Sequence, residues 1–287
     1  MVSRGISPAY FISRFSGNFG PEEIGSALPD IASLGYDAVQ LELFRAEDIE
    51  LWSAQPIDGL RRQFAAEGLR VSQGVAHFLG DGFTSPEALL RNDDEHFKRT
   101  LEIFDAFEEC RICTLPQPPF RYMPAGAKPD AATYRDLRLR LLEKLHRFLR
   151  ITESMGHSLA LEILPYSIVG GSEGFLSLYA SLSQPDLGYN FDTGHALACK
   201  ENLSLLPLKL GKLVYGTHLS DNHAGESLSL KPGDGIVEWT ELLRSLDAAG
   251  YEGSLDIEIK CSPERVEEEY REGLAALDAF TAQTFGG

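Results

Sequence analysis

Ionisable side chains recur in the sequence where short apolar runs come to an end. These runs are rich in aliphatic residues, and six of them finish on or next to a carboxylate or an imidazole: Glu42, His77, Glu162, Asp192, His218 and Glu258. Strands of a parallel sheet are covered on both faces, so a charged side chain near a strand end costs free energy unless it has a partner there. The six residues are therefore candidates for one shared polar site.

Four of these residues have the right chemistry to surround a divalent cation. Glu162, Asp192 and Glu258 would supply carboxylate oxygens, and His218 an imidazole nitrogen. Such an oxygen-rich set suits Mn²⁺, Mg²⁺ or Co²⁺ better than it suits a closed structural zinc site. We expect one divalent ion, with Mn²⁺ as the first choice and Mg²⁺, Co²⁺ or Zn²⁺ as alternatives.

Purely structural roles are also open to some of these residues. Glu42 fits a solvated position at a loop start equally well, and His218 and Asp221 fit a satisfied histidine and a helix N-cap. Glu162 and Glu258 have apolar neighbours on both sides, which argues against simple solvent exposure. The recurrence of such residues on four consecutive apolar runs favours a common site.

The elements that would position these residues alternate regularly along the chain. Residues with strand character occupy 6–12, 37–43, 69–77, 111–116, 158–164, 187–195, 213–221 and 253–260. Helical patterns follow them at 22–34, 58–68, 86–108, 131–155, 173–183, 201–210, 237–249 and 263–283.

Eight such units predict an α/β fold, a parallel (β/α)8 TIM barrel formed by residues 1–287 as a single domain. The carboxyl ends of the strands meet at one mouth in this architecture, so residues far apart in sequence can reach one ion. A doubly wound open sheet is the rival fold. It loses its main signal because no G-x-G-x-x-G turn or phosphate-binding loop follows the first predicted strand.

Composition restricts the partners and the location of the protein. The chain has 43 acidic residues against 26 Lys and Arg, a net charge of −17, which disfavours nucleic acid and anionic membrane surfaces. The sequence contains no signal-peptide core and no membrane-length apolar run, which predicts a cytoplasmic protein. The C-x-x-C pair Cys110 and Cys113 lacks a second pair, so reduced thiols are favoured over zinc.

The motifs LALEILP, NFDTGHA, THLSDNH and LDIEIK resemble those of the xylose isomerase-like TIM barrel superfamily, the sugar phosphate isomerase/epimerase group, along nearly the whole chain. The resemblance implies metal ligands at Glu162, Asp192, His218 and Glu258, and a substrate-contacting histidine at His195. It also implies that Glu162 and Glu258 flank the reacting carbon as a catalytic acid/base pair. Neighbouring polar residues complete the predicted substrate-binding set: His77, Glu42, Asp221, His223 and Lys260.

The chemistry of such a pair is proton transfer next to a carbonyl. A bound cation polarises the carbonyl oxygen, so a carboxylate can remove the adjacent proton and form an enediolate. Return of the proton gives an isomerase or epimerase of a sugar, keto-sugar or cyclitol. Loss of a β-hydroxyl or aglycone from the same enediolate would instead make a lyase of a keto-sugar, keto-inositol or 3-keto-glycoside.

Departures from the family pattern narrow these expectations. Ser229 stands where many members carry a histidine, and the run TLPQPPF lacks the histidine of the branch that cleaves DNA at apurinic sites. The motifs are not surrounded by a lysine and arginine cluster, which favours a neutral substrate over a phosphorylated one. A non-catalytic sugar-binding or partner subunit remains an alternative, and a homo-oligomer is possible.

Overall fold

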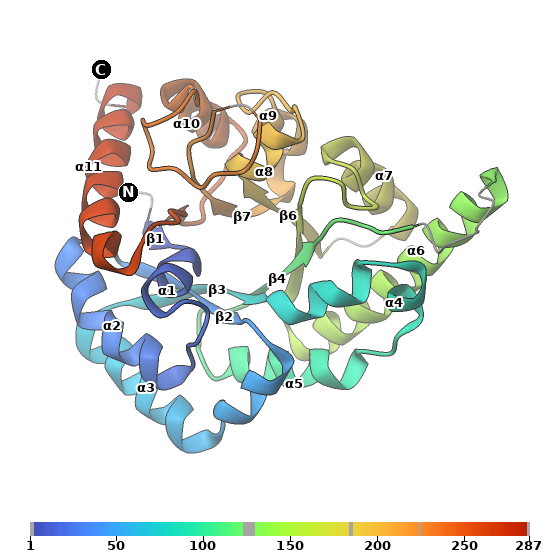
Figure 1. The fold of residues 1–287 in the computed structure, drawn as a ribbon, viewed down its shortest axis with the longest axis horizontal. Helices are drawn as coiled ribbons and strands as arrows, with labels where there is room; N and C mark the ends of the chain where they lie inside the picture. The colour runs from blue at the N-terminus through green and yellow to red at the C-terminus, as the bar shows by residue number, and fades with distance from the viewer. Residues whose placement is uncertain (1–2, 123–129, 184–185, 224, 286–287) are drawn as a thin grey trace.

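Eight parallel strands lie at the centre of the protein, and helices form a ring around them (Figure 1). A computed structural model describes residues 3–122, 130–183, 186–223 and 225–285. The strands are β1 (Arg4–Ile6), β2 (Ala38–Leu43), β3 (Arg70–Ala76), β4 (Ile112–Gln117), β5 (Ser158–Ile163), β6 (Leu187–Asp192), β7 (Val214–His218) and β8 (Leu255–Ile257). Their order in the sheet is β7-β6-β5-β4-β3-β2-β1-β8.

The two outer strands of this order approach each other and nearly close the sheet. β1 pairs with both β2 and β8, and a parallel bridge joins Leu219 to Ile257. The Leu219 N–H donates to the Asp256 carbonyl at 2.8 Å, and the Glu258 N–H donates to the Leu219 carbonyl at 2.9 Å. The predicted (β/α)8 barrel is confirmed.

The helices and short 3₁₀ turns lie between successive strands. The longer helices are α2 (Pro21–Leu34), α3 (Ala54–Glu67), α5 (Asp94–Asp105), α6 (Ala131–Met155), α7 (Ser172–Leu182), α10 (Trp239–Ala248) and α11 (Val266–Phe285). The shorter helices are α1 (Ala9–Phe15), α4 (Pro86–Leu90), α8 (Thr193–Ala198) and α9 (Leu206–Leu210). The 3₁₀ turns are η1 (Ala46–Leu51), η2 (His77–Phe83), η3 (Gly211–Leu213) and η4 (Pro263–Arg265).

Helix α6 begins and ends at residues whose types favour helix caps, so its bounds can be predicted from the sequence. The side chain of Asp130 accepts a hydrogen bond from the Thr133 N–H at 2.8 Å and caps the first turn. Gly156 ends the helix with φ at +72°, the left-handed conformation that glycine adopts most easily. Between these caps, Leu141, Leu145 and Phe148 face the core. The expected range 131–155 is confirmed.

The predicted first strand, 6–12, is wrong. Strand β1 spans only Arg4–Ile6, and most of the apolar run belongs to helix α1. Pro8 cannot donate to a strand ladder but fits the start of a helix, where its missing N–H is not needed. Tyr10 and Phe11 are fully buried on this helix. The run is too short for its hydrophobic periodicity to distinguish a buried helix from a buried strand.

The helix expected at 86–108 is two helices, α4 and α5, separated by residues 91–93. Asp93 is buried at the break, and its carboxylate accepts hydrogen bonds from Arg91 Nε at 2.6 Å and from Lys144 Nζ at 2.7 Å. Lys144 is itself fully buried and also donates to the carbonyls of Gly82 and Ala88. This buried ion pair fixes the link between the two helices against α6.

Two predicted strands are shorter than expected because the chain turns at the barrel mouth. The strand at 187–195 ends at Asp192, where α8 begins, and the strand at 253–260 is reduced to Leu255–Ile257. The weak helical stretch at 201–210 forms a helix only at Leu206–Leu210. All four cysteines are free. Among the described helices, none combines the length and apolarity that crossing a membrane requires.

Candidate metal and substrate site

Four buried side chains from four consecutive strands meet at the carboxyl end of the barrel. Glu162 lies on β5, Asp192 and His218 end β6 and β7, and Glu258 directly follows β8. One ligand atom from each lies within 4.8 Å of all the others. The strand register contributes directly, because Asp192 and His218 are paired neighbours across β6 and β7.

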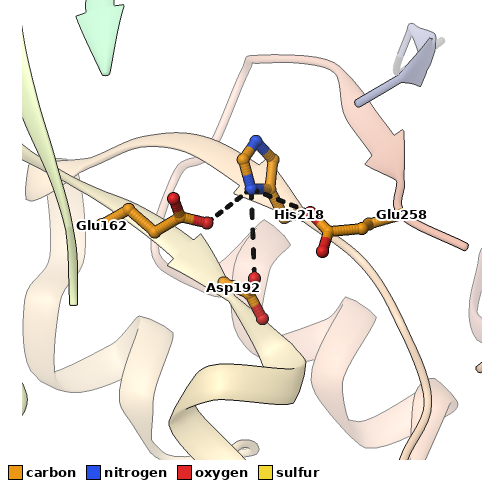
Figure 2. A group of neighbouring side chains, drawn as sticks. All are labelled: Glu162, Asp192, His218 and Glu258. Atoms are coloured by element: carbon orange, nitrogen blue, oxygen red, sulfur yellow. Dashed lines mark hydrogen bonds and ion pairs between the residues drawn. The ribbon is translucent and has the colours of Figure 1, made fainter. Parts of the chain in front are cut away.

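The imidazole of His218 is the centre of this cluster (Figure 2). Its Nδ1 lies 2.7 Å from Glu162 Oε1, 3.1 Å from Glu258 Oε2 and 4.0 Å from Asp192 Oδ2. Figure 2 shows Glu162 and Glu258 approaching this nitrogen from opposite sides, with Asp192 between them. Three carboxylates therefore converge on one nitrogen.

The electrostatics of the cluster follow from burial and from this convergence. Burial lowers the pKa of His218, but the charges of Glu162, Glu258 and Asp192 outweigh it and raise the pKa well above its usual value. Burial raises the pKa of Asp192, and the charges of Glu258 and Glu162 raise it further. Burial raises the pKa of Glu162, but the charge and the hydrogen bond of His218 lower it further, so that it lies below its usual range.

The donor set fits a divalent cation. Three buried carboxylates around one imidazole leave an excess of negative charge, which is costly away from water and which a dication would neutralise. Asp192 Oδ2 is buried and forms no hydrogen bond with any described residue. Its other oxygen accepts the His195 N–H at 2.7 Å and caps helix α8, which fixes the carboxylate with Oδ2 toward the cluster.

Hydroxyl groups hold the carboxylate of Glu258 from two directions. Ser229 Oγ donates to Glu258 Oε1 at 3.2 Å, and Ser7 Oγ lies 3.5 Å from Oε2. Ser229 is fully buried and has a positive φ of 50°, an uncommon backbone conformation for a residue other than glycine. The residue that replaces the family's histidine thus contacts a predicted ligand.

Gln40 on β2 determines which nitrogen of His218 carries a proton. Gln40 Nε2 lies 3.3 Å from the Thr217 carbonyl, which can only accept, so this atom must be the amide nitrogen. The same side chain donates to Asp256, where burial raises the pKa of the carboxyl and hydrogen bonds from Ser254 and Gln40 partly offset that rise.

Because the atom next to the Thr217 carbonyl is the amide nitrogen, the atom that faces His218 Nε2 at 2.8 Å is Gln40 Oε1, which must accept from it. Neutral His218 therefore carries its hydrogen on Nε2 and presents the bare Nδ1 to the three carboxylates. An outer partner that fixes the tautomer of a ligating histidine is a general feature of metal sites. Gln40 is not among the residues predicted from the sequence, although its position two residues before Glu42 puts both side chains on one face of β2.

The remaining predicted site residues fall into two groups. Glu42 and His77 lie next to the cluster as a pair, with Glu42 Oε1 3.0 Å from His77 Nδ1. His195 lies beside Asp192, with its Nε2 3.4 Å from Asp192 Oδ2. Its Nδ1 is buried without a partner among the described residues. These three positions are compatible with the predicted substrate contacts.

Asp221 occupies a different environment from the one expected. It is buried, and its oxygens accept from the Gly233 and Val237 N–H groups and from Trp239 Nε1, at 2.9 to 3.0 Å. It therefore organises the chain that leads from β7 to α10, which argues against a substrate contact. His223 and Lys260 expose their side chains, and neither is joined to the cluster by an ion pair or hydrogen bond within the described ranges.

Comparison with known proteins places the chain in a family. The family model described as xylose isomerase-like TIM barrel matches residues 28–280. The chain belongs to the xylose isomerase-like TIM barrel family. A curated relative, an uncharacterized protein of Methanocaldococcus jannaschii, is 28% identical over 121 residues, which is 40% of this chain and 41% of that protein.

Solved structures of xylose isomerase-like barrels share the fold along nearly the whole chain. D-psicose 3-epimerase in the presence of D-fructose has a TM-score of 0.77 at 17% identity, covering 99% of this chain and 100% of that one. The 3-keto-D-glucoside 4-epimerase of E. coli has a TM-score of 0.75 at 20% identity, covering 97% and 100%. The zinc-bound IolI protein has a TM-score of 0.72 at 16% identity, covering 98% and 97%.

The chain spans only part of one further similar structure. A fusion of a xylose isomerase-like TIM barrel with a 4-hydroxyphenylpyruvate dioxygenase has a TM-score of 0.74 at 19% identity, and the match covers 99% of this chain but 43% of the fusion protein. Because the identities of these solved structures to the chain are 20% or lower, the similarity shows a shared fold alone.

Metal binding is expected to release a proton from His218. The pKa of this imidazole is raised in the metal-free cluster, so at pH 7 it is protonated and must lose the proton before Nδ1 can bind a cation. The apparent affinity for Mn²⁺ should therefore rise about tenfold per pH unit below that pKa. Calorimetric titrations in two buffers of different ionisation enthalpy measure the protons released, and a binding constant that is flat from pH 6 to 8 would contradict this ligand assignment.

Replacing Gln40 tests the tautomer. Gln40→Leu removes the acceptor at His218 Nε2, so the imidazole can place its hydrogen on Nδ1, and the affinity for Mn²⁺ should fall by roughly 10–100-fold. Competition with a chelator measures the affinity, and ¹⁵N shifts of the histidine ring identify the tautomer. Gln73→Leu is the matched control, because Gln73 is a buried barrel amide that donates to Asn190 and does not contact His218. Equal loss in both variants would show a general packing effect.

Proposed function

We propose that the protein is a metal-dependent isomerase or epimerase that removes a proton next to the carbonyl of a sugar, keto-sugar or cyclitol. The observation that carries this proposal is the opposed pair of glutamates, with one oxygen of Glu162 and one of Glu258 at 2.7 and 3.1 Å from the same nitrogen of His218. Two carboxylates that approach one position from opposite sides can serve the two faces of a substrate carbon held next to that position.

We propose Glu162, Asp192, His218 and Glu258 as the ligands of one divalent ion. Three carboxylates and one imidazole favour Mn²⁺, while Mg²⁺, Co²⁺ and Zn²⁺ accept the same donors. A similar barrel, the IolI protein, was solved with zinc. When bound, the cation supplies an electrophile that withdraws charge from the substrate's carbonyl oxygen.

The residues of the chain then divide the proton transfer between them. One of Glu162 and Glu258 acts as the base, and the other returns a proton to the opposite face of the planar enediolate. Ser229 and Ser7 orient the Glu258 carboxylate through its two oxygens. His195 lies at the edge of the cluster with its Nε2 3.4 Å from Asp192 Oδ2, where its imidazole can bind a substrate hydroxyl.

The relatives' names support the same class of reaction. Psicose 3-epimerase and 3-keto-glucoside 4-epimerase, as their names state, change the configuration of one sugar carbon. We extend this class of reaction to the present chain as part of the proposal, together with a cytoplasmic location and a single domain over residues 1–287. Elimination from the same enediolate would make the protein a lyase and needs no additional residue. The proton-exchange experiment described next distinguishes elimination from isomerisation.

Proton exchange in deuterated water tests the proposed reaction. The Mn²⁺-loaded protein is incubated with free ketoses, keto-inositols and 3-keto-glycosides, and deuterium incorporation is followed by mass spectrometry and NMR. We expect metal-dependent incorporation at a carbon next to the carbonyl, with an isomer or epimer as product. Release of water or aglycone would identify a lyase. Absence of exchange with the whole panel would favour a non-catalytic sugar-binding or partner subunit.

Conservative replacement of each glutamate separates metal binding from proton transfer. A glutamine keeps an oxygen that can coordinate but cannot accept a proton at neutral pH, so Glu162→Gln and Glu258→Gln should lose roughly 10²–10⁴ in rate even at saturating Mn²⁺. Single-turnover exchange identifies the first base, because only its variant should block deuterium incorporation. Glu252→Gln is the control, since Glu252 is exposed and precedes β8 at the opposite end of the barrel. Near-normal turnover of either metal-saturated variant would show that this glutamate binds the metal but does not transfer a proton.

A further inference from the structure

A cavity of about 560 Å³ opens at the ends of β2 and β3, and His77, which lines it, contacts Glu42 in the barrel mouth. It is formed by the residues that follow these strands and by the link between α4 and α5, and its lining includes Phe44, His77, Phe78, Arg91, Asn92 and His96. No residue of the proposed metal set contributes to the lining. A volume in this range suits a small organic ligand.

We propose that this cavity binds a second sugar ring of the substrate, so that the substrate is a disaccharide or a similar glycoside. The inference rests on the proposed function for the identity of the reacting ring, which would lie at the metal cluster. The new element is a separate subsite for the ring that does not react.

The lining combines aromatic surfaces with planar polar groups, as saccharide recognition requires. Phe44 and His77 lie with ring centroids 4.6 Å apart, and Phe78 packs edge-on against His96 at 6.1 Å. The C–H face of a pyranose packs against such rings, while its hydroxyls need donors and acceptors around the rim. Arg91 Nε donates to Asp93, and within the described part of the chain its terminal nitrogens meet no acceptor, so they are available to a hydroxyl.

The charges of the lining favour a neutral ligand over an anion. Arg45 and Arg91 are balanced by Glu47, Asp81 and Asp93, and Arg45 is already bound to Asp48 through Nε and a terminal nitrogen. A phosphate or carboxylate would meet three carboxylates and only two guanidinium groups. A large apolar group would strip water from these charges without replacing their hydrogen bonds, which costs free energy. A polyhydroxylated ring satisfies both conditions.

Glu42 and His77 connect this cavity to the metal cluster. His77 lines the cavity, and its Nδ1 lies 3.0 Å from Glu42, whose side chain is buried in the mouth. Partial burial lowers the pKa of His77, but the hydrogen bond and charge of Glu42 and the charge of Glu162 raise it overall. The field of a proposed metal ligand thus reaches the cavity wall, and one ligand spanning both sites would pass along this pair.

Equilibrium binding of unreactive sugars tests the subsite. The Mg²⁺-loaded full chain is titrated with glucose, fructose and a panel of glucose disaccharides covering α- and β-linkages, and saturation-transfer NMR maps the bound ring. At least one disaccharide should bind about tenfold more tightly than either monosaccharide, because it fills the additional cavity.

Two variants locate the binding. Phe44→Ala removes an aromatic face, and Arg91→Ala removes a donor while Lys144 still neutralises Asp93 at 2.7 Å. Each should weaken disaccharide binding by about tenfold, as truncation of an anchoring side chain does. Phe285→Ala and Arg62→Ala are the controls, since Phe285 and Arg62 are exposed and lie outside this cavity. Circular dichroism and the thermal melting of every variant, measured alongside, confirm that each one folds.

The outcomes distinguish the subsite from the proposed function. Absence of a preferred disaccharide, or equal binding by all four variants, overturns the subsite even if proton exchange occurs with free ketoses. Disaccharide binding that depends on Phe44 and Arg91 supports the subsite even if no substrate exchanges protons, and in that case the enzymatic proposal alone fails.

Discussion

Repulsion among three buried carboxylates is the constraint that the rest of the site depends on. Glu162, Asp192 and Glu258 converge on one nitrogen of His218 in a region with little access to water, where like charges repel strongly. One imidazolium offsets only part of this charge. The arrangement persists because each residue is fixed on a different strand of a hydrogen-bonded barrel, so no single side chain can withdraw without disturbing its neighbours.

Hydrogen bonds to surrounding groups hold the side chains of the cluster in position despite this repulsion. Asp192 caps α8 with one oxygen and thereby points the other into the cluster, so the turn that ends β6 also orients a proposed metal ligand. Gln40 links Asp256 to His218 and fixes the imidazole, while Ser229 restrains Glu258. These contacts hold the donors in position before any ligand arrives, which lowers the reorganisation needed for binding.

Much of the fold and of the cluster could be predicted because the sequence features that indicate them lie within short segments. The capped helix at 131–155, the alternation of strands and helices, and the four residues of the cluster can all be read from short segments. The first strand was wrong because a short apolar run fits a buried strand and a buried helix equally. The position of Asp221 was not predictable either, since its partners Gly233 and Trp239 reach it only after the intervening chain folds back.

Gln40 and Glu42 show how one strand can serve two regions of the mouth. Their side chains share a face of β2, yet Gln40 bonds to His218 within the barrel, whereas Glu42 bonds to His77 at the cavity wall. The second oxygen of Glu42 is buried and has no partner among the described residues. A buried carboxylate oxygen without a donor is costly, and a hydroxyl of a ligand lying between the two regions would satisfy it. The strand that fixes His218 would then also contact a ligand that extends toward the cavity.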